Sequence, residues 1–211
     1  MDADDLVAFL GASPTPWHAV VEARRRLDSA GFRELLEGDR WKLAAGDRVY
    51  VVRGGSTIAA FELGDGALEE TGLRLVGAHT DSPNLRIKPA GLALKSGQHQ
   101  ALVEPYGGVL WHTWLDRDLG LAGRVLVRGS GGPGEIEETL VRVDRGVARV
   151  PSLAIHLDRS VNTDGLKLNP QQHLGPVLGL ESGGALDLGA LVTELLGATG
   201  KTVATADVLG F

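Results

Sequence analysis

The sequence of 211 residues contains no cysteine, which excludes disulfide bonds and metal sites built on thiolates. Any metal ion held by this chain must therefore be bound by His, Asp or Glu side chains. Basic charge is also scarce, because 21 Lys and Arg residues against 27 Asp and Glu residues give a formal net charge of -6. This balance argues against nucleic acid as a partner, since phosphate binding needs clustered positive charge.

No stretch of the sequence reaches the roughly 20 apolar residues of a membrane-spanning helix. The first ten residues, MDADDLVAFL, are acidic and lack the basic start and long apolar core of a secretory signal. We therefore expect no membrane partner and a cytoplasmic location. The composition that remains, 43% hydrophobic and 23% charged residues, is typical of a globular protein with one large or two modest domains.

The apolar pattern of the first 89 residues predicts helices packed on a sheet, the opening half of an α/β domain. Acidic residues suit the start of the first helix, and a Pro-containing break separates it from an amphipathic second helix. A compact Gly-Gly turn between two apolar runs favours a hairpin. The expected elements are helices at 2–10 and 17–31 and strands at 48–52, 57–63 and 73–78.

From about residue 90 the sequence changes to short apolar runs separated by Gly, Pro and polar turns, which predicts a mainly β segment. The Gly-rich stretch 129–134 lacks the Gly-Lys-Ser/Thr ending of a phosphate-binding loop, so we expect it to connect two strands. A final helix is predicted at 186–196, ahead of Gly197. The expected strands are 92–94, 100–105, 123–127, 138–143 and 146–150.

The strand expected at 73–78 would place His79 and Asp81 at its carboxyl end, where open α/β sheets carry their chemistry. Residues two apart in an extended segment share a face, so the imidazole and the carboxylate can point the same way. His79 could then bind a metal ion while Asp81 fixes the orientation and tautomer of the ring. Taken alone, the short pattern favours a simpler interpretation, a strand-end histidine capped by a nearby acid. A catalytic triad with Ser82 is excluded, because neighbours in sequence rarely converge as a triad.

Five stretches, in the same order, resemble the M18 family of metalloaminopeptidases, the aspartyl aminopeptidase group. The segment VGAHTDSPNLRIKP, which contains His79 and Asp81, is similar to the metal-binding segment of that family. Together the five stretches span nearly the whole chain, which is identified as a member of the family. The other four are SPTPWHAV near the start, VEPYGGVLWHTWLDRDLGLAGRV from Val103, IHLDRSVN from Ile155 and KLNPQQHLGPVLG from Lys167.

The resemblance implies an α/β fold in which a β-rich dimerisation domain interrupts a mixed-sheet metallopeptidase catalytic domain after the first metal-binding motif. Residues 1–89 would be the amino-terminal part of the catalytic domain, 90–203 the β-rich insert and 204–211 the start of the return. We expect the catalytic domain to be incomplete, because the family's remaining acidic and histidine ligands follow the point where this sequence ends. The large assemblies of the family imply a homo-oligomer formed through the insert.

The resemblance also implies a zinc-dependent aminopeptidase that hydrolyses N-terminal residues, acidic ones (Asp or Glu), from peptides. Two zinc ions are expected in a complete enzyme, although His and carboxylate sites also accept other divalent metals. The resemblance makes His79 a metal ligand, Asp81 the residue that orients it, and His156 a catalytic group that reaches the active site of a neighbouring subunit. An imidazole there suits stabilisation of the developing oxyanion. The residues alone would instead make His156 a buried strand histidine.

A catalytic zinc ion normally has three protein ligands, so the isolated chain is expected to be inactive. The alternative function is a catalytically inactive chain that acts in oligomerisation or regulation through its β-rich insert. A split gene, with the second part supplied separately, is a related alternative. The charged triplet Asp116, Arg117 and Asp118 is expected to form ion pairs at a subunit contact, while His18 and His173 are expected to be structural.

Overall fold

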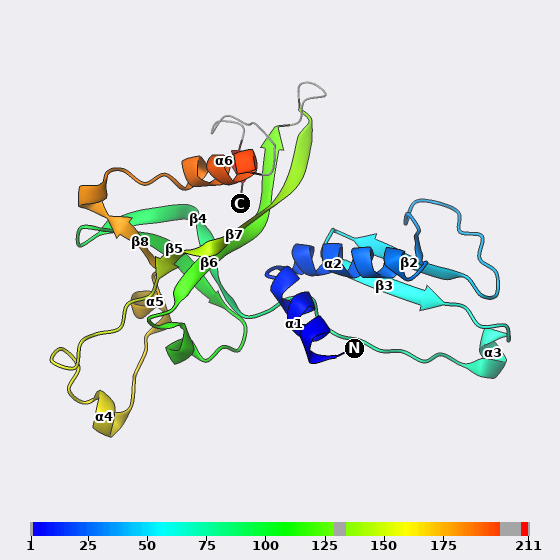
Figure 1. Ribbon diagram of the computed structural model, residues 1–211, viewed down its shortest axis with the longest axis horizontal. Coiled ribbons are helices and arrows are strands. Elements are labelled where there is room, and N and C mark those ends of the chain that lie inside the picture. The colour runs from blue at the N-terminus through cyan, green and yellow to red at the C-terminus, as the bar shows by residue number, and fades with distance from the viewer. Residues whose placement is uncertain (1, 129–133, 199–207, 211) are drawn as a thin grey trace. The chain divides into compact units, whose positions relative to one another are not determined.

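The computed structural model describes residues 2–128, 134–198 and 208–210, and its chain divides into two compact units (Figure 1). The first unit is Met1–Ser82 and the second is Pro83–Phe211. Both contain helices and sheet, so the predicted mixed α/β character is confirmed. The expected boundary after residue 89 falls inside a strand of the second unit, and the assignment of catalytic and dimerisation domains stays a prediction.

Both helices predicted at the start of the first unit are present, and side chains cap their first turns. The carboxylate of Asp2 accepts a hydrogen bond from the backbone amide of Asp5 at the start of the first helix. The hydroxyl of Thr15 accepts one from the amide of His18 at the start of the second, where Pro16 occupies a position that needs no N–H donor. The helices are α1 (Ala3–Ala12), α2 (Pro16–Ser29) and the short α3 (Leu68–Thr71).

The first unit contains a three-stranded sheet with the order β1-β2-β3, and the predicted hairpin is confirmed. The strands β2 and β3 pair antiparallel from Arg48↔Glu62 to Arg53↔Thr57, while β1 runs parallel to β2. Gly54 supports the hairpin turn because its φ of 57° lies in the left-handed region that favours glycine. The strands are β1 (Arg33–Glu34), β2 (Arg48–Arg53) and β3 (Thr57–Glu62).

The two faces of β2 hold this unit together. Val49 and Val51 are buried on one face in a cluster with Leu35. Tyr50 is buried on the other face, and its hydroxyl donates a hydrogen bond to the Asp28 carboxylate of α2 at 2.8 Å. Alternation along the strand therefore gives the sheet one purely apolar face and one face that binds the helix.

The strand predicted at 73–78 is not formed, and this prediction was wrong. Residues 72–79 have no regular secondary structure, and the side chains of Leu73, Leu75 and Val76 are 79%, 93% and 95% exposed. A strand is stabilised by hydrogen bonds to a neighbouring strand and by burial of a face. Within the described residues, no strand pairs with this segment. Apolar composition alone is therefore insufficient here, because the segment lacks a neighbour in this structure.

The second unit is built on a six-stranded sheet with the order β4-β5-β8-β7-β6-β9 and antiparallel neighbours. The strands predicted at 138–143 and 146–150 form one continuous strand, although its pairing with the preceding strand shifts register around Gly146, between Leu119↔Ala148 and Leu121↔Val143. A Cβ at Gly146 would lie 2.8 Å from the Cβ of Asp118, so the glycine permits close approach of two strands. The strands are β4 (Asn84–Lys95), β5 (Gln98–Tyr106), β6 (Asp118–Arg128), β7 (Ile136–Arg149), β8 (Val177–Leu180) and β9 (Val208–Gly210).

The predicted last helix, α6 (Leu188–Ala198), is confirmed and packs on β7. Its Val192 and Leu196 are buried with valines of β6 and β7, which gives this unit its main core. Of the described helices, none combines the length and the apolar composition needed to cross a bilayer. The predicted connection at 129–134 and the return at 204–211 fall mostly outside the described residues. The remaining short elements are η1 (Trp111–Trp114), α4 (Val161–Asp164), α5 (Pro170–His173) and η2 (Glu181–Gly183).

Candidate functional site

The imidazole of His79 contacts two oxygens of Asp81. Its Nδ1 lies 2.7 Å from the backbone carbonyl oxygen and 3.1 Å from the carboxylate oxygen Oδ1. Both oxygens are hydrogen-bond acceptors, so we assign the proton of the neutral ring to Nδ1. The lone pair then resides on Nε2, the nitrogen left available to a metal ion.

The side chains of His79 and Asp81 share one side of the backbone although no strand precedes them. The His79 side chain is 80% exposed and that of Asp81 40%, so the ring faces solvent and not an apolar interior. In a loop, a ring at position i can reach the carbonyl and carboxylate at i+2 directly. The pairing therefore comes from a local contact between neighbours and not from the pleat of a sheet.

Thr80 ties this segment to the hairpin of the first unit. Its hydroxyl donates a hydrogen bond to the backbone oxygen of Ser56, in the β2–β3 turn, at 2.8 Å. The turn itself packs on α2, because a Cβ at Gly55 would lie 3.3 Å from Trp17 Cδ1. The sequence contained no local signal for this anchor, since the two partners are 24 residues apart.

The described residues do not form a complete metal site. Within them, no three His, Asp or Glu side chains converge in a way that could hold a metal ion. His79 fits one coordination position of a zinc ion, with Asp81 as the carboxylate behind it. Three protein ligands are the usual requirement of a catalytic zinc ion, and the described residues bring together fewer than that.

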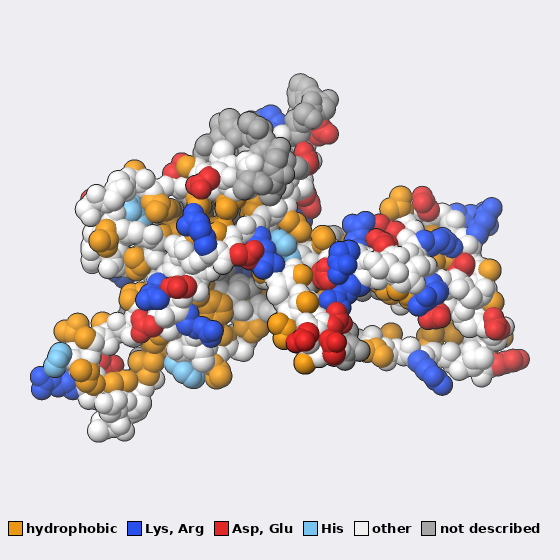
Figure 2. Space-filling model, in the orientation of Figure 1, with side chains coloured by type: hydrophobic (Ala, Val, Ile, Leu, Met, Phe, Trp, Pro, Cys, Tyr) orange, Lys and Arg blue, Asp and Glu red, His pale blue; other side chains and the backbone are white. Residues whose placement is uncertain are grey.

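His156 lies in a loop between β7 and α5 and is exposed, so the expectation from the residues alone of a buried strand position was wrong. The chain leaves the sheet after Val150, and its projecting segment carries α4 (Figure 1). Hydrophobic side chains are visible on this projection in Figure 2. Among the described residues, the imidazole of His156 has no hydrogen-bond partner. His79 belongs to the first unit and His156 to the second.

Two members of the charged triplet that follows η1, Asp116 and Asp118, make contacts within the chain. The carboxylate of Asp118 pairs with Arg149 across β6 and β7 at 2.7 Å. Asp116 instead accepts hydrogen bonds from the backbone amide of Ser152, at 3.1 Å, and from the Ser152 hydroxyl. These hydrogen bonds lower the pKa of Asp116 and favour its ionised form. Sequence reasoning missed the contact of Asp116 with Ser152.

Two further histidines make local contacts near helix starts, in keeping with the structural roles expected for them. His18 Nδ1 lies 2.7 Å from the hydroxyl of Thr15, the capping residue of α2. His173 Nδ1 accepts a hydrogen bond from the backbone amide of Asn169, the capping residue of α5, at 3.1 Å.

Comparison with known proteins links this chain to a family of peptidases. The family model described as "Aminopeptidase I zinc metalloprotease (M18)" matches residues 9–192. A probable M18 family aminopeptidase 2 of Streptomyces coelicolor is 54% identical over 177 residues, covering 84% of this chain and 39% of the relative. The aspartyl aminopeptidase of Aspergillus oryzae is 46% identical over 178 residues, covering 83% of this chain and 35% of the relative.

Solved structures are similar over almost the whole chain. The structure of the Ape4 and Nbr1 complex matches with a TM-score of 0.88 and 35% identity, covering 98% of this chain and 42% of that chain. The Saccharomyces mApe1 dodecamer matches with a TM-score of 0.76 and 26% identity, covering 99% of this chain and 46% of that chain. The chain therefore spans less than half of the length of each of these similar proteins.

Proposed function

Because the chain belongs to the M18 family of aminopeptidases, we propose that it contributes the His79 segment to a zinc-dependent aminopeptidase that removes N-terminal Asp or Glu residues from peptides. The observation that carries this proposal is the contact of His79 with Asp81, which leaves Nε2 of an exposed ring available. Zinc is supported by the description of the matching family. The acidic preference is supported by relatives named aspartyl aminopeptidases.

In this proposal, His79 and Asp81 act as one ligand unit. Zinc, when bound, polarises a scissile carbonyl and lowers the pKa of a water molecule. Nε2 of His79 supplies one coordinating lone pair, while the carboxylate and carbonyl of Asp81 hold the proton on Nδ1. The same contacts restrict rotation of the ring. Two ions and further ligands are expected in the complete site, in line with the family resemblance.

His156 is proposed to act in the active site of a neighbouring subunit. Its support is the exposed position on the projecting loop and the absence of a hydrogen-bond partner among the described residues. An imidazole N–H can stabilise the oxyanion that develops when water attacks an amide. A homo-oligomer formed through the β-rich second unit belongs to the same proposal, and the similar mApe1 structure is a dodecamer. A cytoplasmic location is part of it as well.

The test compares the chain alone with a chimera in which it replaces the matching part of the Aspergillus oryzae aspartyl aminopeptidase. Zinc content and hydrolysis of N-terminal Asp, Glu, Ala and Lys amides are measured for both proteins. We expect zinc binding and preferential hydrolysis of acidic substrates in the chimera, and neither in the chain alone. His79→Ala should abolish both, whereas His112→Ala, at an exposed histidine of η1, is the matched control.

Two outcomes would contradict the proposal. A chimera that folds and assembles but neither binds zinc nor hydrolyses these amides would exclude the role of the His79 segment. If, in addition to such an inactive chimera, the chain alone forms a defined oligomer by light scattering, the alternative of a catalytically inactive oligomerisation protein gains support. Stoichiometric zinc and turnover in the chain alone would show instead that its own residues complete the site.

A further inference from the structure

The loop that carries His156 has few means of fixing its own direction. This segment, residues 151–169, is called the His156 loop below. All seven residues from 151 to 157 are exposed, with 66%, 45% and 74% exposure at Leu153, Ile155 and Leu157. Burial of apolar side chains therefore contributes little to holding this part of the loop. A turn closed by the Leu157 amide on the Ala154 carbonyl at 2.8 Å and the cap of α5 at Asn169 hold later parts of the loop. The contacts at its start set the direction in which the chain leaves the sheet.

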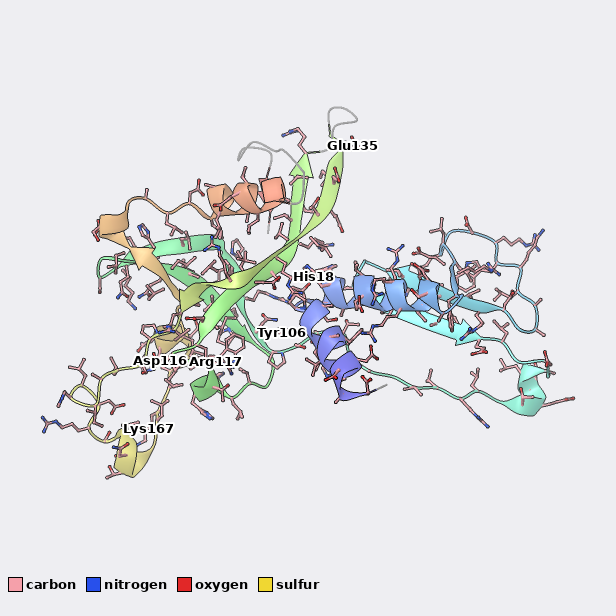
Figure 3. All side chains as sticks on the ribbon, viewed as in Figure 1. His18, Tyr106, Asp116, Arg117, Glu135 and Lys167 are labelled. Carbon is pink, nitrogen blue, oxygen red and sulfur yellow. The ribbon has the colours of Figure 1, made fainter. Side chains whose placement is uncertain are left out.

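Asp116 makes those contacts with both its backbone and its side chain. Its amide donates to the carbonyl oxygen of Val150 at 2.8 Å, next to a bridge between Leu115 and Val150. One carboxylate oxygen accepts from the Ser152 amide at 3.1 Å, and the other accepts from the Ser152 hydroxyl. In Figure 3, Asp116 lies where the loop leaves the sheet, and Lys167 lies farther out on the same loop.

The backbone of Asp116 is adapted to this role. Its φ of 55° lies in the left-handed region, which costs free energy for residues other than glycine but is tolerated by Asp and Asn. The conformation allows one residue to use its amide and both carboxylate oxygens toward the same strand end. Hydrogen bonds to an ionised carboxylate are stronger than those between neutral groups. Two such bonds on one serine restrain its backbone as well as its side chain.

We propose that Asp116 is a positioning residue, which fixes the start of the His156 loop and thereby the direction in which the loop presents His156. This inference rests on the proposed role of His156. Ser152 is four residues before His156, a span of at most about 13 Å that the turn at 154–157 shortens. Without a fixed start, the ring can therefore occupy a large volume. With Ser152 held at both amide and hydroxyl, that volume shrinks.

Three substitutions separate the contributions of the carboxylate and the backbone. Asp116→Asn keeps a residue that tolerates the left-handed conformation and retains one acceptor oxygen. Asp116→Gly permits the same backbone but removes both acceptors. Ser152→Ala removes the hydroxyl donor and keeps the amide donor. Asp118→Asn is the matched control, because it alters the neighbouring Asp118–Arg149 ion pair without touching Ser152.

Hydrogen exchange of the 211-residue chain, followed by mass spectrometry, tests the positioning directly. Asp116→Gly should accelerate exchange of the Ser152 amide, whose acceptor it removes, by about 10-fold or more, as expected for loss of a hydrogen bond to a charged group. Asp116→Asn and Ser152→Ala should give smaller accelerations, and Asp118→Asn none in this loop. Amides in the paired region of β6 and β7 serve as the internal reference. Unchanged loop exchange in Asp116→Gly, with a folded sheet, would overturn the inference.

Kinetics of the chimera separate this inference from the proposed function. The proposed role of His156 and the positioning role of Asp116 are both supported if His156→Ala and Asp116→Gly each lower kcat with little change in KM. Asp116→Asn should then restore part of the lost kcat. If His156→Ala lowers kcat but Asp116→Gly does not, the positioning role is overturned while the function of His156 stands. If His156→Ala has no effect on kcat, the proposed role of His156 fails, and with it the functional part of the inference.

Discussion

The two segments that carry the candidate site histidines, His79 and His156, are fixed in opposite ways. At His79 the ring itself is held, because Nδ1 contacts the carbonyl and carboxylate of Asp81 two residues away. At His156 the described residues offer the ring no hydrogen-bond partner, and the contacts lie instead at the start of the loop, between Asp116 and Ser152. The His79 segment is therefore restrained at the histidine side chain itself, whereas the His156 loop is restrained at the backbone where the loop begins.

The difference matches the two tasks that we propose. A metal ligand must offer one nitrogen in a defined tautomer, which requires a partner on the other nitrogen. A histidine that reaches a neighbouring subunit can find its partners there, and only its direction of approach must be set within its own chain. Substitutions that act on one kind of restraint should leave the other segment unchanged.

The largest expected effect concerns α2, the helix on which the β2–β3 turn packs, and this turn accepts the hydrogen bond from Thr80 of the His79 segment. Glu22 accepts hydrogen bonds from Arg25 and Arg26, each with contacts of 2.7 Å, and these bonds lower its pKa to about 2. Because the folded pKa is depressed, the contribution is present above the unfolded pKa of about 4.3 and is lost as pH falls toward 2. We expect a loss on the order of 2 kcal/mol from the first unit.

Urea unfolding at pH 7, 4 and 2.5, followed separately for the two units by hydrogen exchange, checks this expectation. Glu22→Gln should reduce the acid-dependent loss in the first unit, because the neutral amide does not titrate, while Glu37, whose pKa Arg53 lowers, keeps its own share. The acid sensitivity of the second unit serves as the internal reference, because Glu22 lies in α2 of the first unit. Equal acid sensitivity of wild type and Glu22→Gln in the first unit would contradict the assignment.

Asp81→Ala is expected to produce the next largest effect, a decrease of about 10- to 100-fold in zinc affinity of the chimera. The substitution removes the carboxylate that contacts Nδ1 and leaves the backbone carbonyl of residue 81 as the remaining acceptor. Competition with a metal chelator measures the change. The comparison predicts that Asp116→Gly leaves zinc affinity within about 2-fold, since it acts on the other segment.

A cavity in the core of the β2–β3 hairpin, to which Thr80 of the His79 segment is hydrogen-bonded, should destabilise the first unit. Val49 is completely buried in the cluster with Leu35 and Val51, so Val49→Ala is expected to cost about 2 kcal/mol of unfolding free energy. Chemical denaturation of the first unit measures the loss. Val125→Ala, at a similarly buried valine of the second unit, is the matched control that should destabilise the other sheet instead.

The anchor at Thr80 should have a smaller and more local effect. Thr80→Val keeps the shape of the side chain and removes its hydrogen bond to the Ser56 carbonyl, which is expected to cost about 1 kcal/mol. Hydrogen exchange from residue 79 to 82 should accelerate by about 5-fold, while the His156 loop remains unchanged. Faster exchange throughout the hairpin would show that Thr80 stabilises the unit in general and not this segment in particular.

These anchors show where sequence reasoning succeeded and where it could not. The helices α1, α2 and α6 and the β2–β3 hairpin follow local patterns of capping, spacing and turn residues, and all were predicted. The pairing of His79 with Asp81 is also local. The contacts Thr80–Ser56 and Asp116–Ser152 join residues 24 and 36 positions apart, so no local pattern reveals them. The unformed strand at 73–78 failed for the same reason, because a strand depends on a neighbour.

The smallest effect is expected from Leu75→Asp in the chain alone. The Leu75 side chain is 93% exposed, so its replacement should change the free energy of unfolding by less than about 0.5 kcal/mol. Val76, at 95% exposure, gives a second substitution of the same kind.

The same changes in the chimera sharpen the comparison, since a contiguous exposed apolar run often marks a surface covered by another part of a protein. A loss of several kcal/mol there, against almost none in the chain, would show that the relative's additional length covers this run. Equal and small losses in both proteins would show that the segment before His79 stays exposed, and that Thr80 and Asp81 hold the ring without a strand.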